Sequence, residues 1–152
     1  MGARTLGLRT VARASKQVEF LATVPLFSAL THDELTTVVR AAEELDVAGG
    51  DELVTESRVG RDFFLILDGD AVVRRNGRKV ATLGPGNWFG ELSLIDNQPR
   101  SATVVAVTDM KLLVLGQAEF GGLLETVPSM AAKLLRGIAF RLREADARSV
   151  TN

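Results

Sequence analysis

The chain has 152 residues, of which 46% are hydrophobic and 24% charged, an ordinary composition for one soluble globular domain. Its formal net charge of −1 provides no field that would draw it to nucleic acid or to an anionic membrane surface. Because it has no cysteine and no apolar run long enough for a signal peptide or a membrane span, we exclude disulfides and cysteine metal sites and expect a cytoplasmic protein.

The N-terminal part is predicted to be an extension that contains one weak helix. Residues 1–10 show no apolar periodicity, and residues 11–24 show only a faint helical one. A clearer helix is predicted over about residues 32–43. Thr31 and Glu34 have capping-box spacing at its start, where each side chain satisfies a backbone N–H of the other residue.

From about residue 43 to 115 the apolar period changes to two, which is typical of strands. Asp68-Gly69 and Asn76-Gly77 are strong turn signals, and the second lies between two alternating runs, the sequence pattern of a two-residue hairpin. Many short strands joined by glycine-containing turns, without intervening helices, predict an antiparallel β-roll.

The helical period returns after Gly116. A short helix is predicted over residues 117–125, and Pro128 is suited to open a longer one that ends near Ala147. The apolar face of this longer helix is interpreted as core, with room for a partner surface: Met130, Ala131, Leu134, Leu135, Ile138, Ala139 and Leu142. The fold class is therefore α+β and mainly β, an antiparallel β-roll (a jelly-roll-like double-stranded β-helix) flanked by N-terminal helices and a C-terminal helix pair.

The stretch "GPGNWFGELSL" does not fit the strand pattern, because its apolar residues take a helical spacing. It predicts a single helical turn that starts near Gly90, where free backbone N–H groups would attract an anion. Arg100 can return to the same place and form paired charge-assisted hydrogen bonds with phosphate oxygens. Ser101 adds a hydroxyl, and the small Ala102 leaves its N–H accessible. These residues together predict a phosphate cradle.

Glu91 would repel a bare phosphate, but its carboxylate accepts a hydrogen bond from a hydroxyl. A ribose 2′-OH beside a cyclic phosphate suits Glu91 and Arg100 at once. A structural ion pair between these two residues is the alternative, and the neighbouring glycine and small residues disfavour it. The segment therefore predicts a site for a sugar and its phosphate.

The segment "FGELSLIDNQPRSATV" resembles the phosphate-binding cassette of the cyclic nucleotide-binding domain family. That family includes catabolite activator-like proteins, regulatory subunits of cAMP-dependent kinase and cyclic nucleotide-gated channels. Its cassette, F-G-E-(L/I/M)-(A/S)-L, a variable turn and P-R-(S/A)-A-(T/S)-V, is matched at every named position, and the resemblance extends over about residues 25–145. One departure is Glu56-Ser57, where the family often has Glu-Gly in a turn that needs positive φ.

The resemblance implies both a domain layout and a set of ligand-binding residues. The binding domain would span residues 25–148, with the β-roll at about 43–115 and the C-terminal helices at about 117–147, between an extension at 1–24 and a tail at 149–152. Its ligand contacts would be backbone groups of Gly90 and Leu92, Glu91 on the ribose 2′-OH, Ser93 beside the sugar-phosphate, Arg100 on the exocyclic oxygens, and Ser101 and Ala102 completing the cradle.

The expected function is a sensor whose C-terminal helices move when it binds a nucleotide, and not an enzyme. No cofactor or metal is expected, because His32 is the only histidine and the sequence has no cluster of metal ligands. The expected ligand is cAMP, with cGMP as the alternative, because Ser101 could contact a guanine edge.

The expected partners are a protein or a second copy bound through the last helix. The chain reaches Asn152 without a recognition helix, so no direct binding of nucleic acid is expected. The rival hypothesis is an interaction module that kept the fold and no longer uses the ligand.

Overall fold

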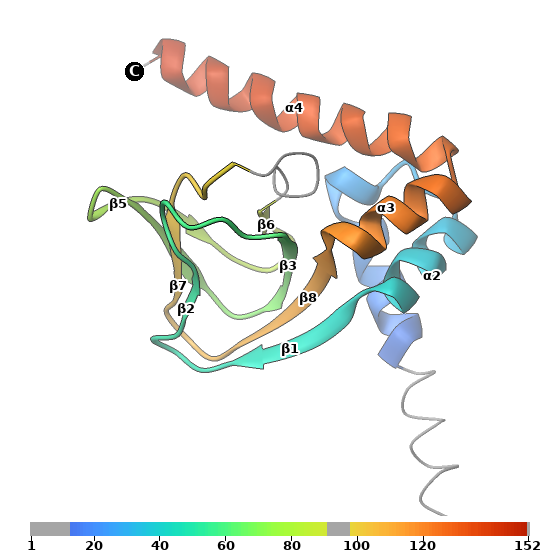
Figure 1. Cartoon of the computed structure of the whole chain (residues 1–152), viewed down its shortest axis with the longest axis horizontal. Helices are drawn as coiled ribbons and strands as arrows, with labels where there is room; N and C mark the ends of the chain where they lie inside the picture. The colour runs from blue at the N-terminus through green and yellow to red at the C-terminus, as the bar shows by residue number, and fades with distance from the viewer. Residues whose placement is uncertain (1–12, 91–97, 152) are drawn as a thin grey trace, which may run out of the picture. The chain divides into compact units, whose positions relative to one another are not determined.

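The structure is a computed structural model that describes residues 13–90 and 98–151. The chain forms two compact units. One contains Met1–Arg40 and Gly122–Asn152, and the other contains Ala41–Gly121. The labelled strands in Figure 1 all belong to the second unit.

The second unit is an antiparallel β-roll of two four-stranded sheets, as the sequence predicted. Strands that follow one another along the chain often lie in different sheets, because the chain crosses from one layer to the other at its turns. β1 and β8 run side by side in the first sheet (Figure 1). That sheet has the order β1 (Glu43–Val47), β8 (Met110–Gly116), β3 (Asp62–Asp68) and β6 (Trp88–Phe89). The second sheet has the order β2 (Glu52–Val54), β7 (Thr103–Ala106), β4 (Ala71–Arg75) and β5 (Arg78–Leu83).

Alternating residues of these strands form the core of the roll. Ile66 and Leu112 are completely buried, and the rings of Phe64 and Phe89 stack with their centroids 4.8 Å apart. Aromatic stacking adds to the free energy gained by burying the rings themselves. The whole cluster consists of Phe64, Ile66, Ala71, Phe89, Val104, Ala106, Met110 and Leu112.

Two turns take the left-handed backbone conformation at a residue that is not glycine. Asn76 has φ 54° and Gly77 has φ 76°, and the flanking Arg75 and Arg78 pair across β4 and β5, so the predicted hairpin is confirmed. Ser57, at the departure from the family pattern, has φ 73°. The turn is therefore kept with a serine, a conformation that costs roughly 1 kcal/mol more than it would for glycine.

The first unit is helical. Its capping box is present: the Thr31 N–H donates to Glu34 Oε1 at 2.8 Å, and the Glu34 N–H donates to Thr31 Oγ1 at 3.2 Å. Residues 13–22 are also helical, and none of the described helices is long and apolar enough to cross a lipid bilayer. The remaining helices are η1 (Pro25–Phe27), α2 (His32–Ala41), α3 (Gln117–Thr126, which crosses the unit boundary) and α4 (Ser129–Thr151).

α4 runs past the predicted end, and its predicted core face is wrong for three described residues, because Leu135, Ala139 and Leu142 are exposed. The exposed fractions of Leu135 and Leu142 are 57% and 54%. The helix packs on η1 through another side, at Gly137, where an added Cβ would lie 2.8 Å from Leu26 Cδ1. Since residues two apart point to nearly opposite sides of a helix, the packing at Gly137 leaves Leu135 outward.

Candidate functional site

An open cavity of about 210 Å³ lies in the β-roll unit beside Arg100. Its wall is formed by β2, the loop that leads into β3, the start of β3, and the chain just before β7. Apolar side chains form one part of the wall, and charged or polar groups form the rest. The lining residues are Leu53, Val54, Thr55, Arg58, Val59, Gly60, Asp62, Phe64 and Arg100. A partly apolar cavity with a few convergent polar groups is the usual form of a small-molecule site.

The backbone of Arg100 is held by the loop on the opposite wall. The Arg100 N–H donates to the carbonyl of Arg58 at 2.8 Å, and the Ser57 N–H donates to the carbonyl of Arg100 at 2.8 Å. Val59 and Pro99 form an isolated antiparallel bridge beside them. The base of the Arg100 side chain is therefore fixed in the sheet-like pairing of two loops.

The guanidinium of Arg100 is also positioned at its far end. Its Nη2 donates to the backbone carbonyl of Asp62 at 2.9 Å. A Cβ at Gly60 would lie 2.5 Å from Nε of Arg100, and one at Gly90, where φ is +81°, would lie 2.6 Å from Nη1. The guanidinium thus occupies space that only glycine leaves open at both positions. A planar group held in this way is prepared to bind an anion such as a phosphate.

Changing Gly60 to alanine tests this packing. We expect Gly60→Ala to displace the guanidinium and to weaken binding of an anionic ligand by about tenfold, the loss of roughly one charge-assisted hydrogen bond. Isothermal titration calorimetry measures the affinity, and urea unfolding checks that the protein still folds. Gly121→Ala is the control, because a Cβ there meets nothing within 4 Å. Equal affinities for the two variants would contradict the packing role of Gly60.

Among the predicted site residues, the structure brings together Gly90 and Arg100. Ser101 is exposed, and its carbonyl accepts a hydrogen bond from Arg75 Nε at 3.2 Å. Neither Ser101 nor the half-buried Ala102 is among the residues that line the described cavity. Glu91, Leu92 and Ser93, the predicted helical turn, and the alternative ion pair between Glu91 and Arg100 lie outside the described residues.

Sequence reasoning missed the loop that faces Arg100, above all Arg58, Gly60 and Asp62. These residues reach the site because residues 57–59 pair with residues 99–100, about forty positions later in the chain. No local pattern records such a pairing. The one available signal was Gly60, an isolated glycine shortly before β3 with an arginine on each side, at positions 58 and 61.

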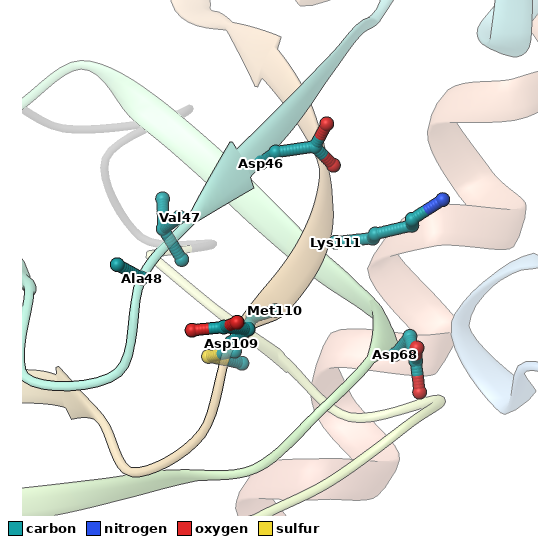
Figure 2. Close-up of a pocket in the computed structure, with 7 residues that line it drawn as sticks. All are labelled: Asp46, Val47, Ala48, Asp68, Asp109, Met110 and Lys111. Carbon is teal, nitrogen blue, oxygen red and sulfur yellow. The ribbon is translucent and has the colours of Figure 1, made fainter.

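A second pocket of about 370 Å³ lies along β1 and β8 in the same unit (Figure 2). Asp46 and Asp68 flank Lys111 on the neighbouring strands, and Asp109 Oδ1 accepts a hydrogen bond from the Gly49 N–H at 3.0 Å. The three carboxylates point in different directions in Figure 2. Within the part of the chain that the structure describes, no group of three or more acidic or histidine side chains could hold a metal ion. We interpret this pocket as a solvated edge of the sheet.

The comparisons with known proteins cover the part of the chain that contains the cavity beside Arg100. The family model described as "Cyclic nucleotide-binding domain" matches residues 44–127, which include every residue that lines this cavity. The N-terminal domain of a transcriptional regulator from Streptomyces coelicolor A3(2) superposes with a TM-score of 0.74 and 35% identity, covering 85% of this chain and 93% of that one.

Two curated relatives are longer proteins. The chain is 35% identical over 127 residues to a cAMP-dependent protein kinase regulatory subunit of Hypocrea atroviridis, and the match covers 84% of this chain and 28% of the relative. It is 34% identical over 127 residues to the Cyclic AMP receptor protein of Thermus thermophilus, with 80% and 59% covered. The chain thus spans less than two thirds of either relative.

Proposed function

The chain belongs to the cyclic nucleotide-binding domain family, and on that premise we propose that it is a sensor domain that binds cAMP in the cavity beside Arg100. The observation that carries the proposal is the Arg100 guanidinium, held between Gly60 and Gly90 and anchored to the carbonyl of Asp62. The proposed binding domain spans residues 25–148.

The proposed ligand contacts are those that the cassette implies. Arg100 binds the exocyclic phosphate oxygens, and Glu91 accepts a hydrogen bond from the ribose 2′-OH. Each charge-assisted contact contributes roughly 1.5–3 kcal/mol, so the two together supply much of the roughly −8 kcal/mol of a micromolar complex. Gly90, Leu92, Ser93, Ser101 and Ala102 complete the proposed cradle.

We favour cAMP over cGMP as the ligand and propose no enzymatic activity. Both curated relatives carry cyclic AMP in their names, as a kinase regulatory subunit and as a receptor protein. The relatives are regulatory or binding proteins, and no catalytic family is indicated.

Calorimetric titration of the full chain, freed of nucleotide by unfolding and refolding, tests the proposed function. We expect one molecule of cAMP to bind per chain at micromolar affinity or better, with a weaker response to cGMP. Tighter binding of cGMP would reassign the ligand. No heat and no thermal shift with either nucleotide would contradict the sensor and favour an interaction module with the same fold.

We further propose that ligand binding is coupled to movement of α3 and α4. The break between these helices, at Val127-Pro128, supplies a hinge. The exposed Leu135 and Leu142 give α4 an apolar stripe, which we propose as the surface for a protein partner or a second copy. Hydrogen exchange reports such a movement, and identical exchange of the α4 amides with and without cAMP would contradict it.

A further inference from the structure

A second arginine lines the cavity beside Arg100. Arg58 lies in the loop between β2 and β3. Its N–H donates to the carbonyl of Thr55 at 3.2 Å, and its carbonyl accepts the N–H of Arg100 at 2.8 Å. The backbones of the two arginines are therefore hydrogen-bonded directly to each other, and their side chains start from adjoining points of one wall.

Arg58 differs from Arg100 in what its side chain does. Arg100 is half-buried, and Asp62 holds its guanidinium. Arg58 is exposed, and no residue that the structure describes forms a hydrogen bond or ion pair with its guanidinium. A packing role or a described hydrogen-bond partner therefore does not account for an arginine at this position of the cavity wall.

The backbone next to Arg58 is strained. Ser57 keeps φ 73°, a conformation unfavourable for a residue with a Cβ, immediately before Arg58. An observed outlier of this kind at the wall of a cavity is evidence that the loop is held in shape by its surroundings, here by the hydrogen bonds to Arg100. The loop thus presents Arg58 at a fixed point of the wall.

Arg58 and Arg100 give the lining of the cavity two positively charged residues. Asp62, whose backbone carbonyl accepts from Arg100, is the one acidic residue among the described lining residues, so the lining keeps a formal charge of +1. Two like charges at one cavity repel each other, and an anion that contacts both relieves the repulsion. The cavity is therefore suited to an anionic ligand that contacts both.

We propose that Arg58 is a second phosphate-contacting residue, which binds the ligand's phosphate together with Arg100. The inference rests on the proposed function, because it takes the cyclic phosphate of the nucleotide as the anion. Arg58 acts mainly through its charge, since its exposed side chain has no described hydrogen bond that would fix a bidentate geometry. Arg58→Lys should therefore keep the affinity for the ligand, whereas Arg100→Lys should not.

The test is a calorimetric titration of the full chain with cAMP at low and at physiological salt. We expect Arg58→Gln to weaken binding about 3- to 10-fold at low salt and to reduce the salt dependence of the affinity, as for an exposed charge at a binding site. Arg58→Lys should stay within about twofold of the unchanged protein. Arg61→Gln is the matched control, because Arg61 is an exposed arginine of the same loop that does not line the described cavity.

The outcomes separate this inference from the proposed function. Unchanged affinity in Arg58→Gln, or an equal loss in Arg61→Gln, overturns the contact by Arg58 while the sensor stands. An unchanged protein that binds neither cAMP nor cGMP overturns both. Urea unfolding of Arg58→Gln confirms that any loss of affinity does not come from loss of fold.

Discussion

Replacing Arg100 with lysine should weaken cAMP binding at least about 100-fold, the largest effect that we expect from any single conservative change at this site. A lysine keeps the charge but presents its donors from a single nitrogen, so it cannot place a parallel pair of N–H groups on two phosphate oxygens while a separate nitrogen donates to the carbonyl of Asp62. Two charge-assisted hydrogen bonds of roughly 1.5–3 kcal/mol each correspond to a loss of about 10²- to 10⁴-fold. Calorimetry or competition with a fluorescent cyclic nucleotide measures this loss.

Arg75 provides the matched control. It is an exposed arginine whose Nε donates to the Ser101 carbonyl at 3.2 Å, next to the proposed cradle but outside the described cavity lining. Arg75→Lys should change the affinity by less than about threefold, because one exposed hydrogen bond contributes little. Arg100→Lys should still fold, with roughly 1 kcal/mol lost for its bond to Asp62. Wild-type affinity in folded Arg100→Lys would refute the proposed role of Arg100.

The parts of the fold that local chemistry determines were predictable from the sequence. The Asn76-Gly77 hairpin follows from two residues that tolerate positive φ. The start of α2 follows from the reciprocal capping of Thr31 and Glu34. Neither feature needs a residue distant in sequence, so the local pattern was sufficient.

The features that were missed depend on distant segments. Helical periodicity identified an apolar face of α4, but it did not show that Gly137 on another side would pack on η1 and leave Leu135 exposed. The positions of Arg58 and Gly60 in the site result from pairing between residues 57–59 and 99–100. Sequence patterns record local propensity and periodicity, whereas these contacts arise only when segments distant in the sequence come together.

Glu34, in the helical unit, has one role that the local sequence predicts and another that depends on a distant segment. Its capping role was predictable, but its carboxylate also accepts hydrogen bonds from Ser129 Oγ at 2.8 Å and from Lys133 Nζ at 2.7 Å. Glu34 is only 8% exposed, so this carboxylate, which joins α2 to the first turn of α4, is largely removed from water. Charged groups buried in this way are costly unless their partners are present.

The partners of Glu34 make stability depend on pH. The Lys133 ammonium, and then the Thr31 N–H and the Ser129 hydroxyl, lower the pKa of Glu34 from 4.5 to about 2 against the opposing effect of burial. Because the folded-state pKa lies below the unfolded one, the stabilisation is complete above about pH 4.5 and is lost as the pH falls towards 2. The free energy of unfolding should therefore decrease over this window.

We expect Glu34→Gln to lower the free energy of unfolding at pH 7 by about 1–3 kcal/mol and to flatten its decrease between pH 5 and pH 2. The amide oxygen keeps a capping hydrogen bond, but the ion pair with Lys133 is lost. Urea unfolding at several pH values measures both effects. Asp33→Asn is the control, because Asp33 is an exposed carboxylate one position earlier in the same helical turn. A similar loss in both variants would contradict the special role of Glu34.

A double-mutant cycle of Glu34→Gln with Lys133→Gln isolates the ion pair. We expect a coupling energy of about 1 kcal/mol or more, because the two groups are in direct contact and Glu34 is buried. A coupling near zero would assign the loss in Glu34→Gln to capping and to the hydrogen bond from Ser129. A strong coupling has a consequence for signalling, because it ties Lys133 of α4 to α2. Movement of α4 on ligand binding would then have to carry α2 with it or bend the helix beyond Lys133.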